Sequence, residues 1–160
     1  MRTRVLMVCL GNICRSPLAE GLLKSKVDVQ LVFVDSAGTA GYHIGSLPDS
    51  RSIAVAKKNN IDITDQRCRV FTSADFLQFD LIYAMDQSNY SDIASMAEGP
   101  EQLQKVRLLL DETNLGTREV PDPYYGGERG FEMVFEMIDQ ACESVVQRIF
   151  KIQNKDYGQE

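Results

Sequence analysis

Apolar and polar positions follow one another along the chain in blocks that predict strands and helices in alternation. Short continuous apolar runs are typical of buried parallel strands, and they lie at residues 4–10, 31–35, 81–85 and 106–110. Apolar residues spaced three or four positions apart predict helices, which cover residues 17–26, 48–59, 73–79, 88–97 and 131–152. Ser73 is expected to cap the shortest of them. This alternation predicts a three-layer α/β fold, in which helices cover both faces of a four-stranded parallel sheet.

Length and composition fit one globular domain over residues 1–160. A chain of 160 residues is typical of a single domain. Its balance of 44% apolar and 25% charged residues is that of soluble proteins. The polar stretch at 155–160 is expected to be a frayed tail.

The first apolar run leads into the most informative segment, Cys9-Leu10-Gly11-Asn12-Ile13-Cys14-Arg15-Ser16-Pro17. Gly11 and Asn12 tolerate positive φ, so the chain can turn tightly and point successive backbone N–H groups inward. A concave row of N–H groups binds anions. Ser16 before Pro17 is expected to be the N-cap of the helix at 17–26. The positive end of that helix would face the same loop.

Cys9 is the candidate nucleophile of this loop. Cations and helix N-termini favour the thiolate form of cysteine. Arg15 stays protonated, and its planar fork can hold two phosphate oxygens at once. The Ser16 hydroxyl can donate a hydrogen bond to the sulfur. The segment therefore predicts a phosphate loop after the first strand, with a thiolate beneath the bound oxyanion.

The spacing of Cys9 and Arg15 occurs a second time in the chain, which shows that spacing alone means little. Cys142 and Arg148 are also six positions apart, but they lie in the amphipathic segment 131–152. That segment has no preceding strand, no glycine between the two residues and no Ser-Pro helix start. We interpret Cys142 as a core residue and Arg148 as a surface residue.

Asp122 is the candidate general acid. Pro121 and Pro123 bracket it, and each proline fixes its own φ and restricts the residue before it. The result is a stiff loop that presents one carboxyl group. Nearby negative charge favours the protonated form of a carboxyl, which could then act as acid and later as base. Tyr124 and Tyr125 follow and either wall a slot for an aromatic leaving group or pack within the loop.

The usage of histidine and cysteine argues against a metal site, and no cofactor is expected. The only histidine, His43, lies in a glycine-flanked loop and is expected at the surface. No Cys-x2-Cys pair occurs among the four cysteines, which are Cys9, Cys14, Cys68 and Cys142. Cys14 either forms a reversible disulfide with Cys9 after oxidation or packs beneath the loop.

The charge pattern argues against nucleic acid as a partner. The net charge is −6, whereas proteins that bind nucleic acid carry basic surfaces. No acidic residue occurs in the segment 1–17, so the predicted phosphate loop is locally positive. Neither a signal peptide nor a membrane span is evident. We expect a cytoplasmic, monomeric protein that binds neither membrane nor nucleic acid.

The chain resembles the low-molecular-weight protein tyrosine phosphatases over nearly its whole length. The resemblance rests on the segment at residues 9–17 and on Asp122-Pro-Tyr-Tyr-Gly126, together with Asp35-Ser-Ala-Gly38 and Ala84-Met-Asp86. It implies Cys9 as nucleophile, Arg15 as transition-state clamp and Asp122 as general acid.

The resemblance also implies supporting roles. Asn12 would hold the shape of the loop and Ser16 would support the thiolate, while the loop around Gly11 and Cys14 cradles the phosphate. The implied lining of the substrate slot is Leu10, Ile13, Tyr42, Tyr124 and Tyr125. The implied partner is a tyrosine-phosphorylated protein or peptide. One departure is Gln66, where many family members have a histidine that helps to hold the loop.

Three other functions share part of this pattern with phosphotyrosine hydrolysis. An arsenate reductase or other redox enzyme could use Cys9 and Cys14, although it has no phenol for Asp122 to protonate. A protein arginine phosphatase resembles this chain but has threonine at the position of Ile13. A catalytically silent anion-binding module would not need all of the catalytic residues.

Overall fold

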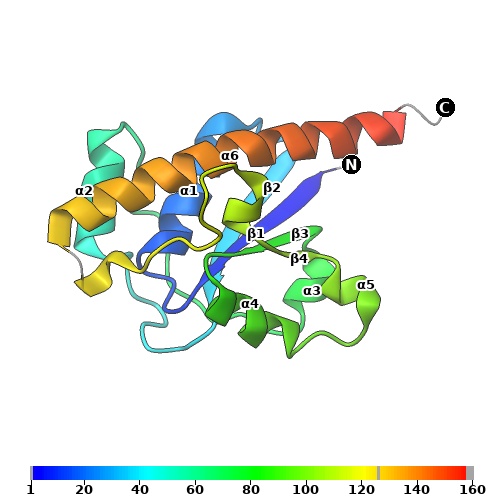
Figure 1. Ribbon diagram of the computed structural model, residues 1–160, viewed down its shortest axis with the longest axis horizontal. Coiled ribbons are helices and arrows are strands. Elements are labelled where there is room, and N and C mark those ends of the chain that lie inside the picture. The colour runs from blue at the N-terminus through cyan, green and yellow to red at the C-terminus, as the bar shows by residue number, and fades with distance from the viewer. Residues whose placement is uncertain (1, 126, 158–160) are drawn as a thin grey trace.

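A four-stranded parallel sheet between two layers of helices forms the molecule (Figure 1). The computed structural model describes residues 2–125 and 127–157. The strand order is β2-β1-β3-β4. The strands are β1 (Thr3–Cys9), β2 (Val32–Gly38), β3 (Leu81–Ala84) and β4 (Val106–Leu108). The predicted α/β fold with four parallel strands is confirmed.

The helices divide between the two faces of the sheet. Figure 1 shows α1 (Arg15–Lys26), α2 (Ser50–Lys58) and the long α6 (Gly127–Tyr157) together on one side. On the other side lie α3 (Asp75–Gln78), α4 (Gln87–Ala94) and α5 (Pro100–Leu103).

The central strand β1 contributes to both cores because successive side chains of a strand point to opposite faces. Val5, Met7 and Cys9 belong to the core beneath α1 and α6. Leu6 and Val8 belong to the core that includes side chains of α3 and α4. All five are buried. The alternation therefore sets Cys9 on the face that carries α1, at the carboxyl end of a central strand.

Element boundaries differ from the predicted ones by a few residues. Strand β2 runs three residues beyond the predicted 31–35 block because Ser36, Ala37 and Gly38 pair with β1. Strand β4 ends at Leu108, and a 3-10 helix, η1 (Leu109–Glu112), follows it. Helix α6 begins four residues before and ends five residues after the predicted 131–152. It overlaps the predicted tail at residues 155–157, and residues 158–160 lie outside the described part.

Both predicted serine caps are wrong. Helix α1 begins at Arg15, so Ser16 lies inside its first turn. Helix α3 begins after Ala74, without a side-chain cap. The caps that do form are Asp49 on α2 and Asp86 on α4. A serine beside a helix start can bond to the helix end or to another partner, and only the tertiary structure decides between the two.

Two smaller features complete the fold. The short α5 was not predicted from the pattern, and a 3-10 turn, η2 (Pro123–Tyr125), precedes α6.

Across residues 2–125 and 127–157, no helix combines the length and the apolar character that crossing a bilayer would require.

Candidate active site

The segment between β1 and α1 forms a tight loop at the carboxyl edge of the sheet. Asn12 has φ 57°, in the left-handed region that asparagine tolerates better than most residues. The loop packs closely against Gly38 at the end of β2. A Cβ atom at Gly38 would lie 2.8 Å from the carbonyl oxygen of Leu10, so only glycine allows the loop to pack here.

The Cys9 sulfur is buried and faces a hydroxyl. Cys9 Sγ lies 3.0 Å from Ser16 Oγ. Ser16 Oγ accepts a hydrogen bond of 2.8 Å from Asn12 Nδ2, so its own proton is available for the sulfur. The other acceptor near this hydroxyl, the Ala37 carbonyl, is more distant at 3.4 Å. Ser16 therefore serves the sulfur and not the end of α1, which is the physical reason that its predicted capping role is wrong.

Behind the loop, a buried hydrogen-bond network reaches a second charged pair. Asn12 Nδ2 also donates to Ser36 Oγ at 3.0 Å, and Ser36 Oγ donates to Glu20 Oε1 at 2.7 Å. Glu20 pairs with Lys24 at 2.6 Å. Burial raises the pKa of Glu20, although the hydrogen bonds from Lys24 and Ser36 oppose the shift. The sequence reasoning assigned no role to Glu20 or Ser36.

Asn12 is held from the opposite side by the segment around residue 68. Arg69 donates its backbone N–H to Asn12 Oδ1 at 3.0 Å. Cys68 Sγ donates to the Asn12 carbonyl at 2.9 Å. Burial, followed by the charge of Cys9, raises the pKa of Cys68, so the thiol keeps its proton for this bond. Gln66 bonds to the first turn of α1, where its Nε2 donates to the Pro17 carbonyl at 3.0 Å.

Arg15 is buried at the floor of the site and anchored by two acceptors. Its Nη1 lies 2.6 Å from Asp86 Oδ2 and 2.9 Å from the Val120 carbonyl. Burial lowers the pKa of Arg15, but the charge of Cys9, the bond and charge of Asp86 and the charge of Asp122 outweigh it and raise the pKa overall. Asp86 had no predicted role. Its place at a helix N-cap just after a strand is the signal that could have revealed it.

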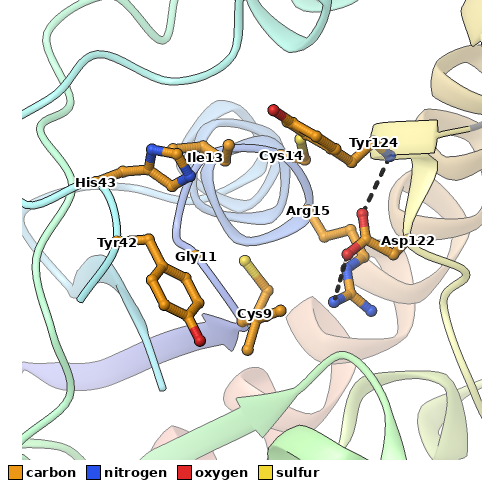
Figure 2. Close-up of a pocket in the computed structure, with 10 residues that line it drawn as sticks. Cys9, Gly11, Ile13, Cys14, Arg15, Tyr42, His43, Asp122 and Tyr124 are labelled. Carbon is orange, nitrogen blue, oxygen red and sulfur yellow. Dashed lines mark hydrogen bonds and ion pairs between the residues drawn. The ribbon is translucent and has the colours of Figure 1, made fainter. Parts of the chain in front are cut away.

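Asp122, which is far from Arg15 in the sequence, lies near the same guanidinium. Its Oδ2 lies 3.7 Å from Arg15 Nη2, and its Oδ1 accepts the Tyr124 N–H at 3.1 Å (Figure 2). The side chain of Asp122 is 40% exposed. A carboxyl that borders both Arg15 and solvent can exchange protons with a bound molecule and with water.

These groups surround one pocket of about 220 Å³. Figure 2 shows the Cys9 sulfur between Tyr42 on one side and Arg15 and Asp122 on the other. The lining residues are Cys9, Leu10, Gly11, Ile13, Cys14, Arg15, Tyr42, His43, Asp122 and Tyr124. The structure thus brings together most of the predicted site residues. Asn12 and Ser16 do not line the pocket. The side chain of Tyr125 lies outside the described part.

His43 is closer to the site than the sequence suggested. It was expected at the surface, but it is half-buried and lines the pocket. A Cβ atom at Gly11 would lie 3.3 Å from His43 Cδ2, so the ring sits against the loop. The prediction of a plain surface position is wrong because nothing in the local sequence shows that residues 39–45 fold back over the loop.

The second cysteine–arginine pair lies outside the pocket. Cys142 is fully buried in the core, and burial raises its pKa to about 12. Its predicted core position is confirmed. Arg148 is half-buried and forms an ion pair with Glu112 on η1, so it is more than the surface residue that was predicted.

In the described part of the chain, no group of three or more possible ligands is arranged to hold a metal ion.

Comparisons with known proteins agree on one family. Residues 4–155 match the family model described as low molecular weight phosphotyrosine protein phosphatase. A relative in Synechocystis, whose name includes low molecular weight protein-tyrosine-phosphatase, is 42% identical over 153 residues, which cover 92% of this chain and 97% of the relative. A Schizosaccharomyces pombe low molecular weight phosphotyrosine protein phosphatase is 39% identical and covers 85% of this chain and 90% of its own.

Solved structures give the same result. A protein tyrosine phosphatase from Entamoeba histolytica, crystallised with Hepes in its active site, has a TM-score of 0.88 and 39% identity, covering 94% of this chain and 99% of that chain. YfkJ from Bacillus subtilis has a TM-score of 0.87 and 35% identity, covering 94% and 96% of the two chains.

Proposed function

The chain belongs to the low molecular weight phosphotyrosine protein phosphatase family and is a hydrolase, and from this premise we propose that it cleaves phosphotyrosine through a cysteinyl-phosphate intermediate on Cys9. The observation that carries the proposal is the shared pocket, in which the Cys9 sulfur, the Arg15 guanidinium and the Asp122 carboxyl all face one space.

In the first step, the Cys9 thiolate attacks phosphorus and the bond to the phenolic oxygen breaks. The electron pair of that bond goes to the oxygen, which takes a proton from Asp122. Proton transfer of this kind contributes ~10²–10⁴-fold to a rate. The products are a neutral phenol, a thiophosphate ester on Cys9 and an ionised Asp122. The 3.0 Å contact between Ser16 Oγ and Cys9 Sγ supports the thiolate before the attack.

Arg15 and the backbone N–H groups of the loop would hold the equatorial oxygens of the transferring group. Phosphoryl transfer depends mainly on positioning and on stabilising charge. Arg15 is prepared for this role because Asp86 and the Val120 carbonyl fix Nη1. A second nitrogen, Nη2, lies 3.7 Å from Asp122 Oδ2.

In the second step, water attacks the phosphorus of the intermediate. Asp122 accepts a proton from the water, the S–P bond breaks, and the electron pair returns to the Cys9 sulfur. Inorganic phosphate leaves, and both residues regain their starting forms. One carboxyl at the edge of the pocket serves both steps, consistent with its partial exposure of 40%.

The walls of the pocket favour an aromatic phosphate ester. Ile13, Tyr42 and Tyr124 present apolar and aromatic groups beside the sulfur, and aromatic rings pack well against such groups. Ile13 offers no hydroxyl to a guanidinium, which favours phosphotyrosine over phosphoarginine. We propose a tyrosine-phosphorylated protein as substrate, a monomeric enzyme, and a cytoplasmic location, where thiols stay reduced.

The proposal is tested in the absence of added metal with p-nitrophenyl phosphate, which has a good leaving group, and with phenyl phosphate, which has a poor one. Cys9→Ser should have no measurable activity because an alcohol is a far weaker nucleophile than a thiolate. Asp122→Ala should lose about 10²–10⁴-fold on substrates with poor leaving groups. Asp111→Ala, which removes an exposed aspartate outside the pocket, is the control and should behave as wild type. Full activity in Cys9→Ser would refute the mechanism.

A further inference from the structure

The general-acid loop presents two partly exposed side chains, Asp122 and Tyr124, to the pocket. Asp122 and Tyr124 each have about 40% of their surface exposed, and the loop carries them from the far end of the chain. A catalytic group that is displaced by about 1 Å can lose ~10²-fold in rate. The position of this loop therefore matters for the rate, and a second chain of contacts joins it to the phosphate loop besides those of Arg15 with Val120 and Asp122.

The first part of that connection is the start of α2. Asp49, the N-cap of α2, donates its backbone N–H to the Ile13 carbonyl at 2.8 Å. Ile13 belongs to the phosphate loop, so the first turn of α2 is tied to the loop that holds Cys9. The carboxylate of Asp49 also accepts the backbone N–H of Arg51 at 2.8 Å.

The second part is a forked ion pair between Asp49 and Arg51. Arg51 Nε lies 3.0 Å from Asp49 Oδ1, and Arg51 Nη2 lies 3.1 Å from Asp49 Oδ2. Two parallel bonds of this kind fix the plane of a guanidinium as well as its position. Arg51 is thereby oriented with its third nitrogen, Nη1, directed away from Asp49.

The third part joins Arg51 to the acid loop. Arg51 Nη1 donates to the Tyr124 carbonyl at 2.9 Å. The guanidinium carbon also lies 5.2 Å from the centre of the Tyr124 ring and 4.6 Å from that of the Phe131 ring on α6, within the range of cation–π attraction. Figure 1 shows α2 beside the beginning of α6, where these contacts occur.

The last part is the bond from the Tyr124 N–H to Asp122 Oδ1 (Figure 2). We propose that Arg51 is a positioning residue, which locks the loop of the general acid Asp122 to the phosphate loop through Asp49 and Tyr124. The inference rests on the proposed function, because it assumes that Asp122 is the proton donor. Arg51 itself does not line the pocket.

A purely structural role for Arg51 predicts a different result. A half-exposed ion pair contributes little to stability, so its loss would lower stability slightly and affect all substrates alike. A positioning role instead makes the loss depend on the leaving group. Substrates that need a proton from Asp122 suffer, whereas substrates with a good leaving group do not.

The test compares kcat/KM for phenyl phosphate, a poor leaving group, with kcat/KM for p-nitrophenyl phosphate, a good one. Arg51→Ala should lower kcat/KM about tenfold for phenyl phosphate and less than about threefold for p-nitrophenyl phosphate. The tenfold loss is a part of the ~10²–10⁴-fold that general acid catalysis contributes to the rate. Arg51→Lys should restore part of the ratio, because it keeps the cation but not the fork. An unchanged ratio in Arg51→Ala would overturn the inference.

Arg118→Ala is the matched control, because Arg118 makes the same forked pair with Asp111, at 2.8 and 3.0 Å, outside the pocket. Its ratio should equal that of wild type, and a change as large as in Arg51→Ala would also refute the inference. Asp122→Ala separates the two proposals. A selective loss there without one in Arg51→Ala contradicts only the role of Arg51, whereas no selective loss in Asp122→Ala contradicts the general acid itself.

Discussion

Two cysteines of the phosphate loop lie in different environments. Cys9 Sγ faces the Ser16 hydroxyl at 3.0 Å. Cys14, at the pocket wall, has its pKa raised to about 12 by burial and by the charges of Asp49, Cys9 and Asp122. Cys14 therefore stays a neutral thiol near pH 7. A thiolate is the reactive form of cysteine, so oxidation is expected to begin at Cys9.

The first prediction concerns this pair. Peroxide should convert the Cys9 thiolate to a sulfenic acid, which Cys14 can then attack, releasing water and forming a disulfide. Dithiothreitol would reduce that disulfide and restore activity. Cys14→Ser should therefore recover less activity than wild type after peroxide and dithiothreitol, because its sulfenic acid is open to further oxidation. Equal recovery would show that Cys14 has no protective role.

At the residue scale, the sequence pointed to residues that line the pocket, such as Cys9 and Asp122, and missed the groups that hold them in place. Cys9 could be separated from Cys142 because a strand, a glycine and a helix start surround only the first. Asp122 could be found because two prolines flank it. Glu20, Ser36 and the other supporting groups act through contacts between distant segments, such as the 2.7 Å bond from Ser36 to Glu20. No local pattern encodes such contacts.

At the scale of elements, helix α1 packs so tightly that it requires a glycine. A Cβ atom at Gly21 would lie 2.5 Å from Ile63 Cγ2, and Ile63 is fully buried. Near the start of α6, a Cβ atom at Gly130 would meet nothing nearer than Pro123 Cβ at 3.7 Å. The two helical glycines thus differ in the space around them and not in their backbone preference.

The second prediction uses this contrast. Gly21→Ala should lower the free energy of unfolding, because overpacking costs ~1–3 kcal/mol and exceeds the gain in helix propensity. Gly130→Ala should raise it by up to about 1 kcal/mol, the propensity gain alone. Urea unfolding followed by circular dichroism measures both. The packing account fails if Gly21→Ala is as stable as Gly130→Ala.

The kind and order of the long elements followed from the sequence, whereas their ends did not. Periodicity shows which segments are buried, so β1, β3 and α6 were expected near their observed positions. The end of β2 depends on its pairing with β1, where Gly38 lies beside Cys9. The four-residue α5 has no buried residue, so no pattern of apolar residues could predict it.

At the scale of the whole molecule, two buried thiols, those of Cys14 and Cys142, have pKa values far above the ordinary cysteine value. Burial raises the pKa of Cys14 and of Cys142 from the ordinary 9.0 to about 12. Between pH 9 and 12 the folded protein retains these protons and the unfolded chain loses them. The stabilisation that these two thiols contribute is therefore fully present below pH 9 and is lost as the pH rises from 9 towards 12.

The third prediction follows from this sign. The free energy of unfolding should fall above pH 9 by up to about 1.4 kcal/mol per pH unit for each such thiol. Cys14→Ser removes one of the two groups, so its stability should fall less steeply than that of wild type between pH 9 and 10.5. Urea midpoints across that range measure the slopes, and identical slopes would contradict the assignment of Cys14.

The arrangement of the whole sheet explains why the site is where it is. The loop of Cys9 follows β1, Asp86 follows β3, and the loop of Asp122 follows η1 beyond β4. Ligands of parallel sheets bind at the carboxyl ends of strands, so these segments converge although Cys9 and Asp122 are more than 100 residues apart.

The central claim is that Cys9 carries the phosphate between the two steps. Asp122→Ala should accumulate the intermediate with p-nitrophenyl phosphate, because the good leaving group needs no acid but the attacking water still lacks its base. Rapid denaturation of the reacting variant, followed by digestion and mass spectrometry, locates the phosphate. We predict one phosphate, on the peptide that contains Cys9 and on the sulfur of that residue. Turnover without phosphate on Cys9, or with phosphate on another residue, would contradict the account.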